Sequence, residues 1–275
     1  TINNIGEITS NYDALIVGSD QVWAYLNDRP LIFFLHWKPT YKGTRISYAA
    51  CNPDMQAPWY NRGKIRNLLL KFDHLSVRDN TTATWVKSIS GRDSKIVADP
   101  TLLYDFNDID CVRVINEPYI FAYILGSEIN GGHSAIISKI RQKYGPIKVI
   151  AVAIPNKETS IRDYADHIFY DATPSQWISL IKYATFIYTD SFHGCLFSLK
   201  YNKQFVAYYR ELIRASRLID IRDRYKIDNA IISSVEDLKA RNCLENGIDY
   251  SITTPLVKHH ITESIDFLTN ALNNK

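Results

Sequence analysis

Short hydrophobic runs alternate with segments of helical periodicity along the whole sequence. The runs are rich in β-branched and aromatic residues and are bounded by Gly, Asp or Pro, which is typical of strands. The expected strands are residues 13–17, 45–50, 74–79, 95–99, 119–125, 148–154, 167–171, 185–190 and 204–209.

Helical patterns fill the segments between these strands. The expected helices are residues 58–72, 81–89, 134–144, 176–183 and 194–201. Asn80 is a candidate N-cap for the second helix, and Gly145-Pro146 is a stop signal for the third. Thr173-Pro174 supplies an N-cap and a first-turn proline for the fourth.

Strands that are apolar on both faces and separated by helices predict parallel sheets covered on both sides. We therefore expect an α/β protein with two doubly wound lobes that divide near residues 111–118. The expected domains are an N-terminal lobe (1–113), a C-terminal lobe (114–254) and a closing amphipathic helix (255–275).

Composition narrows the class of protein. The chain has 275 residues, 46% of them hydrophobic, which is enough to bury a sizeable core. The net charge of +3 is spread along the sequence, so nothing indicates a nucleic-acid partner. The cysteines (Cys51, Cys111, Cys195 and Cys243) stand far apart, which favours reduced thiols over a disulfide framework or a zinc site.

Targeting and membrane-spanning segments are not seen in the sequence. This favours a cytoplasmic protein with at most peripheral contact at the inner face of the cell membrane. The chain opens on Thr1 and its only methionine is Met55, so we expect a piece of a longer protein.

The stretch "YTDSFHGCLFS" concentrates chemistry at the junction of a strand and a helix. It contains Asp190, Ser191, Phe192, His193 and Gly194. Ligands of doubly wound sheets bind beyond the carboxyl ends of the strands, where helix N-termini favour anions. We expect an anion site here, with a glycine that allows close approach and a histidine that transfers a proton near neutral pH.

This stretch allows two other interpretations. A Ser–His–Asp hydrolase is disfavoured because the three groups are too close in sequence to form a relay, and no G-x-S-x-G elbow occurs. A histidine that caps the helix or hydrogen-bonds in the core remains open.

Further candidates lie in the first part of the chain. The stretch "VGSDQVW" follows a strand, which places Gly18, Ser19, Asp20, Gln21 and Trp23 at a carboxyl end, although Gly-Ser-Asp is also an ordinary N-cap.

Arg78 closes another strand, so its guanidinium should emerge at the same rim. The alternative for Arg78 is a surface pair with Asp79. Residues 98–101, "ADPT", form a turn that could be purely structural.

Arginines are frequent between residues 210 and 224. Most of this stretch should be a solvated helix face, with one arginine available to an anionic substrate. The histidines His133, His167, His259 and His260 lack metal-ligand spacing and are expected to be surface or structural residues.

Six ordered blocks resemble the polysaccharide pyruvyl transferase family. They are "YDALIVGSDQVW", "RISYAA", "LSVRD", "VADPTLLYD", "TDSFHGCLFSLKYNKQFV" and "ASRLIDI". The resemblance runs from about Tyr12 through the closing helix. It implies two Rossmann-like lobes facing each other across a cleft, as in GT-B glycosyltransferases.

The resemblance also implies an activity. Phosphoenolpyruvate would be the donor substrate, no cofactor or metal would be needed, and the acceptor would be a free or lipid-linked glycan of the cell surface. His193 and Gly194 would line the donor site, and Arg78 would hold the donor's phosphate or carboxylate. Asp20 or Asp190 would deprotonate the sugar hydroxyl.

The chain departs from the family in two places. Many members have an arginine two residues before the histidine, where this chain has Ser191, so Arg217 is expected to meet part of the donor's charge. A first strand–turn–helix unit of about 30 residues is also missing, so the N-terminal lobe is expected to be incomplete.

Two other functions remain open. One is a GT-B glycosyltransferase that uses a nucleotide sugar, and the other is a non-catalytic module for glycan assembly. In either enzyme, Trp23 and Trp59 are the expected acceptor contacts.

Overall fold

The computed structural model describes residues 11–24, 31–36, 41–53, 55, 57–109, 112–154 and 161–273, with the backbone alone for residues 212–214. Contacts divide the chain into two compact units. The first unit comprises Thr1–Leu103 and Lys258–Lys275, and the second comprises Tyr104–Val257. Cys111 lies outside the described residues, as does the start of the segment where a division was expected.

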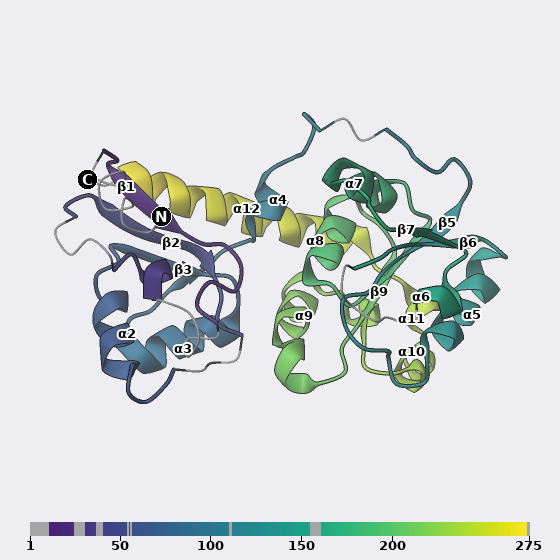
Figure 1. The fold of residues 1–275 in the computed structure, drawn as a ribbon, viewed down its shortest axis with the longest axis horizontal. Helices are drawn as coiled ribbons and strands as arrows, with labels where there is room; N and C mark the ends of the chain where they lie inside the picture. Colours follow the sequence, from purple (N-terminus) through teal and green to yellow (C-terminus); the bar gives the residue numbers. More distant parts are fainter. Residues whose placement is uncertain are drawn as a thin grey trace. The chain divides into compact units, whose positions relative to one another are not determined.

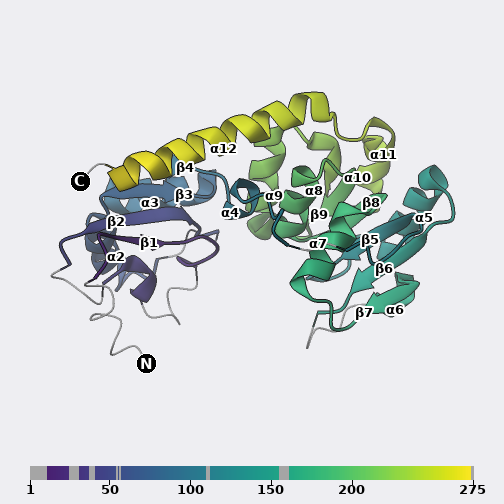
Figure 2. The same cartoon turned by 90° about the horizontal axis from the view of Figure 1, so that it is seen from above.

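The first unit contains a parallel sheet with the strand order β1-β2-β3-β4 among its described residues (β1 to β3 are labelled in Figure 1, and β4 in Figure 2). These strands are β1 (Ala14–Val17), β2 (Thr44–Ala50), β3 (His74–Val77) and β4 (Lys95–Ile96). The short helical elements between and after them are η2 (Leu31–Phe34), α2 (Arg62–Leu69), α3 (Asn80–Ser90) and α4 (Pro100–Leu103). Because all neighbours are parallel, the carboxyl ends of these strands meet at one edge of the sheet.

Apolar side chains bury both faces of this sheet. One cluster joins η2, α2 and α3 to the strands around Trp23, Phe72 and Trp85. On the other face, Phe267 and Leu268 pack against a small cluster that includes Tyr48. These two residues belong to α12 (Tyr250–Asn273), which Figure 2 shows as one continuous helix. The first unit therefore draws part of its core from the last helix of the sequence.

The second unit contains a parallel sheet with the described strand order β10-β9-β8-β5-β6-β7. Its strands are β5 (Tyr119–Tyr123), β6 (Lys148–Val152), β7 (His167–Phe169), β8 (Phe186–Thr189), β9 (Phe205–Tyr208) and β10 (Ile231–Ile232). Counted from β5, the order is 6-5-4-1-2-3, which is that of dinucleotide-binding sheets. The order reverses between β5 and β8, and this switch point is where such sheets bind ligands.

Helices connect the strands of the second sheet. They are α5 (His133–Tyr144), α6 (Ile161–Tyr164), α7 (Pro174–Lys182), α8 (Phe192–Lys200), α9 (Leu212–Tyr225), η3 (Asp228–Ala230), α10 (Val235–Ala240) and α11 (Cys243–Asn246). Helix α7 begins with the capping box formed by Thr173 and Gln176, with Pro174 at its first position. This start was expected from the sequence.

The expected α/β class with parallel sheets is confirmed, and some boundaries differ. Asp79, not Asn80, caps α3, because the Asp79 side chain accepts a hydrogen bond from Thr82 N. The expected closing helix begins earlier, at Tyr250, and Pro255 lies inside it. Among the described helices, none is both long enough and apolar enough to cross a membrane.

Candidate active site

Asp190 joins two loops at the switch point of the second sheet. Its Oδ1 accepts a hydrogen bond from Leu125 N (2.6 Å), and its Oδ2 accepts one from Gly126 N (2.7 Å). Leu125 and Gly126 follow β5, whereas Asp190 follows its neighbour β8. Hydrogen bonds to a charged carboxylate are among the stronger ones in proteins. Asp190 therefore fixes the loops that border the predicted anion site.

Hydroxyl groups hold the turn into α8. Thr189 Oγ1 donates to Tyr123 O (2.6 Å) and accepts from Ser191 N (3.0 Å). Ser191, the N-cap, accepts a hydrogen bond from Gly194 N (3.1 Å) and is 2% exposed. These bonds give Ser191 a structural role in the turn.

Gly194 allows α8 to pack closely on the end of β8. A Cβ at this position would lie 2.8 Å from Thr189 Oγ1 and 3.2 Å from the Ser191 Cβ. Both neighbours belong to the protein, so the missing side chain makes room for them. A packing requirement therefore accounts for glycine at this position, and the expected contact with a ligand stays a prediction.

His193 and Arg217 both contact the Phe192 ring. The half-buried His193 packs edge-on against Phe192, with ring centroids 5.6 Å apart. Arg217, on α9, places its guanidinium carbon 5.8 Å from the centre of the same ring. The cation–π contact brings an arginine to the first turn of α8, where the helix dipole already favours anions. A histidine, an arginine and a helix N-terminus thus lie close together beside the switch point.

A buried aromatic cluster supports the loop that follows β5. His133 Nδ1 lies 2.8 Å from Tyr188 Oη, and Tyr208 Oη donates to Ser127 O (2.9 Å). Burial lowers the pKa of His133, and the charge of Glu128 opposes that shift in part. His133 is 2% exposed, so its expected structural role agrees with its position.

Arg78 is the centre of a largely buried network at the carboxyl edge of the first sheet. Its Nη1 donates to Asp99 Oδ2 (2.9 Å), and its Nη2 donates to Asp20 Oδ1 (3.2 Å). The side chains of Arg78 and Asp99 are 2% and 4% exposed, whereas that of Asp20 is 62% exposed. The arginine thus connects a buried carboxylate to one that faces solvent.

Asp99 collects hydrogen bonds from other parts of the same edge. Its Oδ2 accepts from Ser19 Oγ (2.9 Å), and its Oδ1 accepts from Thr101 Oγ1 (2.6 Å) and Thr101 N (3.0 Å). Burial alone would raise the pKa of Asp99, but the charge of Arg78 and the bonds from Thr101 outweigh burial, so that the pKa is lowered. Asp99 is therefore ionised and holds the network together.

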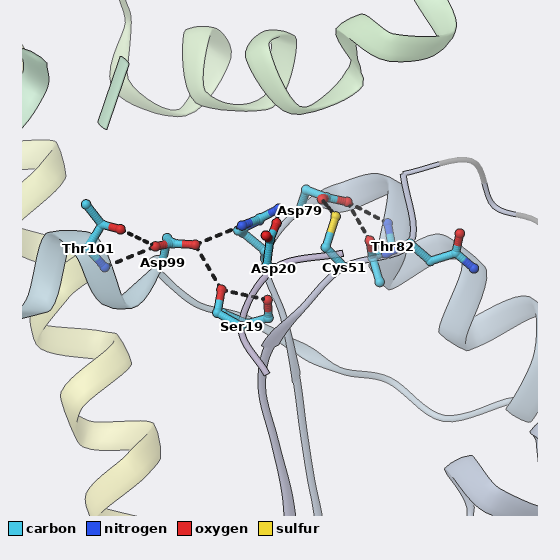
Figure 3. A network of polar contacts seen from close by, with 10 residues as sticks. Ser19, Asp20, Cys51, Asp79, Thr82, Asp99 and Thr101 are labelled. Atoms are coloured by element: carbon cyan, nitrogen blue, oxygen red, sulfur yellow. Dashed lines mark hydrogen bonds and ion pairs between the residues drawn. The ribbon is translucent and has the colours of Figure 1, made fainter. Parts of the chain in front are cut away.

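Asp79 belongs to a neighbouring part of this network. It accepts hydrogen bonds from Cys51 Sγ (2.9 Å) and from Thr82 N and Oγ1 (2.7 and 2.8 Å). All three residues are buried. These contacts tie the end of β2 to the start of α3 (Figure 3).

Several expectations for the first unit are wrong. Arg78 does not emerge at the rim or pair with Asp79, because its guanidinium is buried between Asp99 and Asp20. Trp23 cannot contact an acceptor sugar, since its side chain is 0% exposed, stacks on Phe34 and donates to Phe33 O (3.0 Å).

The other residues predicted in "VGSDQVW" lie in the turn after β1. A Cβ on Gly18 would lie 1.9 Å from Tyr48 O, and the φ of this glycine is +122°, so the turn requires glycine. Gln21 is half-buried, and its carbonyl accepts from Ala24 N (3.2 Å). Trp59, the other expected acceptor contact, is 87% exposed.

The predicted site residues thus form two groups. Gly18, Ser19, Asp20, Gln21 and Arg78 gather at the carboxyl edge of the first sheet, and Asp190, Ser191, Phe192, His193, Gly194 and Arg217 gather at that of the second. Sequence reasoning missed Asp99 as a site residue, although an aspartate that closes a strand in "ADPT" was the available signal.

In the described ranges, no three His, Cys, Asp or Glu side chains come together as metal ligands. Cys51, Cys195 and Cys243 are buried thiols. Burial, the largest influence, raises the pKa of the Cys195 thiol.

The model of the family described as polysaccharide pyruvyl transferase matches residues 2–211. None of the curated proteins matches the sequence of this chain.

Similar solved structures include three proteins whose descriptions name UDP-GlcNAc 2-epimerase or UDP. UDP-GlcNAc 2-epimerase from Neisseria meningitidis, bound to UDP-GlcNAc, has a TM-score of 0.58 at 10% identity, covering 100% of this chain and 80% of that chain. The putative enzyme from Listeria monocytogenes gives 0.56 at 10%, covering 99% and 77%. S. aureus MnaA with UDP gives 0.55 at 11%, covering 99% and 80%. At these identities the likeness shows the fold, and the expected GT-B-like architecture of Rossmann-like lobes is confirmed.

Proposed function

Since this chain belongs to the polysaccharide pyruvyl transferase family, we propose that it transfers the pyruvyl group of phosphoenolpyruvate to sugar hydroxyls. The product is a pyruvate ketal on a cell-surface polysaccharide or its precursor. The observation that carries the proposal is the position of His193 and Arg217 beside the N-terminus of α8 at the switch point of the second sheet.

The donor's charge suits the site on the second unit. Phosphoenolpyruvate carries a phosphate and a carboxylate, and the first turn of α8 provides a positive helix end beside the Arg217 guanidinium. Many family members have an arginine where this chain has Ser191. We propose that Arg217, reaching over Phe192 from α9, supplies the cation in its place.

Proton transfer by His193 would start the reaction. The imidazolium adds its proton to C3 of phosphoenolpyruvate, and a sugar hydroxyl forms a bond to C2 and gives up its proton. The C2–O bond to phosphate then breaks, inorganic phosphate leaves with the electron pair, and a second hydroxyl bonds to C2. A general base accepts each hydroxyl proton in turn; one of the two protons then returns through solvent to the histidine, and the other leaves with the phosphate. Positioned acid catalysis of this kind contributes about 10² to 10⁴-fold.

Asp20 is the better of the two candidate bases. Its carboxylate faces solvent at the edge of the first sheet and is oriented by Arg78 at 3.2 Å. Asp190, in contrast, accepts two backbone hydrogen bonds and orients loops. We therefore assign proton removal from the acceptor to Asp20, with Arg78 and Asp99 as positioning residues.

The acceptor and the place of action are part of the same proposal. The first unit would present the acceptor side, and the glycan would be free or carried on a lipid. A reaction that consumes phosphoenolpyruvate places the protein in the cytoplasm, at most peripherally bound to the membrane.

The test is incubation of the full chain with phosphoenolpyruvate and a panel of free and lipid-linked oligosaccharides. Mass spectrometry should detect a pyruvyl ketal, and released phosphate should match it in amount. The substitution His193→Ala should lower kcat by at least about 10²-fold. His259→Ala is the matched control, since that side chain is 75% exposed on α12, and it should leave the rate unchanged.

Two outcomes would contradict the proposal. Turnover of a UDP- or GDP-sugar without ketal formation would establish a glycosyltransferase. Unchanged biological function in cells that carry His193→Ala would establish a non-catalytic role in glycan assembly.

A further inference from the structure

Two aromatic side chains project into solvent just before α2. Trp59 and Tyr60 are 87% and 59% exposed, and their rings meet edge-to-face with centroids 5.8 Å apart. Backbone hydrogen bonds from Asn61 N to Pro58 O and from Arg62 N to Trp59 O fold this turn into the helix. The aromatic pair is therefore held on ordered backbone.

The exposed face of α2 continues from this pair. Gly63, Arg66 and Leu70 follow a spacing of three and four residues, which places them along one side of α2 and its C-cap. All three are exposed, as is Trp59 in the preceding turn, and Leu70 is 43% exposed. The opposite side carries Ile65, Leu68 and Leu69, which are buried in the core of the first unit. One side of the helix is thus buried in the core, and the other side is exposed to solvent.

The charged residues of the segment that contains α2 are all basic. Residues 57–72 contain four basic residues and no acidic residue. The basic residues are Arg62, Lys64, Arg66 and Lys71, and all are exposed. Arg62 donates to Ser88 O (3.3 Å), which leaves its charge in place. Within the described part of the chain, Lys64, Arg66 and Lys71 make no ion pair. The whole segment therefore presents uncompensated positive charge.

We propose that this cationic–aromatic face, residues 58–71, binds the surface of an anionic phospholipid bilayer. Tryptophan and tyrosine rings favour the boundary between lipid headgroups and acyl chains, and basic side chains beside them are attracted to anionic headgroups. Trp59, Tyr60 and Leu70 supply the apolar contact, and the four cations supply the charge complementarity. The face lies outside both groups of site residues, so bilayer binding requires neither phosphoenolpyruvate nor acceptor.

Sedimentation of the full chain with vesicles tests this inference. Binding is expected to vesicles of phosphatidylcholine with phosphatidylglycerol, to be weak with phosphatidylcholine alone, and to fall as salt is raised. Lys64→Glu/Arg66→Glu should weaken binding by at least about tenfold, because each cation near such a surface contributes a several-fold effect. Trp59→Ala should weaken binding at every salt concentration.

Matched controls separate this face from general charge and aromatic content. Lys239→Glu/Lys258→Glu makes the same change in net charge at exposed positions, and Tyr170→Ala removes a ring that is 60% exposed. Both should bind as the unmodified chain does. Thermal unfolding should show that the Lys64→Glu/Arg66→Glu and Trp59→Ala proteins are folded.

The inference is overturned if the controls lose as much binding as Lys64→Glu/Arg66→Glu and Trp59→Ala, or if the unmodified chain does not sediment with anionic vesicles. It is also overturned if Trp59→Ala dissociates an oligomer in analytical ultracentrifugation while vesicle binding is unchanged, since the face would then join two copies of the chain. Ketal formation is measured without vesicles, so failure here leaves the proposed activity intact.

Discussion

The carboxyl edges of the two sheets use arginine in opposite ways. At the first sheet, Arg78 is buried, with its guanidinium between Asp99 and Asp20. At the second, Arg217 is half-buried and lies over the Phe192 ring beside a half-buried histidine. An arginine held between two carboxylates orients groups within the protein, whereas the Arg217 guanidinium lies over a ring at a helix N-terminus, where the helix dipole favours anions. The first edge thus orients Asp20, and the second combines a guanidinium with a helix N-terminus.

Replacing Arg78 with Met should cause the largest loss of stability. Removing one partner of a buried ion pair leaves Asp99 uncompensated, which costs about 3 to 5 kcal/mol. Urea unfolding followed by circular dichroism measures this loss. Arg66→Met is the control, and it should change stability by less than about 0.5 kcal/mol because Arg66 is exposed. Equal stability of the two variants would mean that the buried network is not formed in solution.

Asp190→Asn should have the next largest effect. The amide can accept from one of the two N–H groups, at Leu125 and Gly126, but it offers a donor to the other, so stability should fall by about 1 to 3 kcal/mol. The loops of the switch point should loosen, and KM for phosphoenolpyruvate should rise. Asp93→Asn changes an aspartate that is 89% exposed and serves as the control. A variant that keeps its stability but loses kcat would return Asp190 to a direct role in proton transfer.

Ser191→Ala removes the N-cap of α8 and should cost about 1 kcal/mol. Ser134→Ala is the control, because Ser134 is exposed in the first turn of α5, and it should lower stability by less than Ser191→Ala does. The difference between the two melting temperatures measures the contribution of the cap. No difference would show that α8 is held by packing alone.

Acid should lower the stability of the first unit by protonating Asp99. The pKa of Asp99 is lowered in the folded state, so its contribution to stability is present above the unfolded pKa of about 3.9. That contribution is lost as the pH falls through the lower, folded-state pKa. Urea midpoints measured between about pH 5 and pH 2 should therefore fall more steeply for the unmodified chain than for Asp99→Asn. If the two proteins show the same pH dependence, Asp99 does not contribute to stability through its ionised form.

The sequence predicted most of the longer strands and helices, and it predicted that the second group of candidate site residues follows a strand. Runs such as "YIFAYIL" and "TFIYTD" announce buried parallel strands, and a polar turn after such a strand must lie at its carboxyl end. Asp190, Ser191 and His193 could therefore be located from local pattern alone. The strand order, which places these residues at a switch point, depends on long-range pairing between β5 and β8 that no local pattern contains.

Partners distant in sequence explain the errors. Asp99 lies 21 positions after Arg78 and Asp20 lies 58 positions before it, so nothing near "LSVRD" reveals that this arginine is buried. Trp23 follows a polar turn and suggests an exposed ring, but its contacts with Phe34, Phe72 and Trp85 come from three other segments. Burial of a single side chain is decided by tertiary packing.

Helix α12 has a consequence for the order in which the protein is completed during synthesis. The strands of the first unit leave the ribosome early, but Phe267 and Leu268, which cover one face of their sheet, are made only after the entire second unit. Domains usually fold in the order of translation. In this protein the core of the first unit is complete only after the second unit has been synthesised. Until α12 leaves the ribosome, one face of the first sheet lacks the side chains of Phe267 and Leu268.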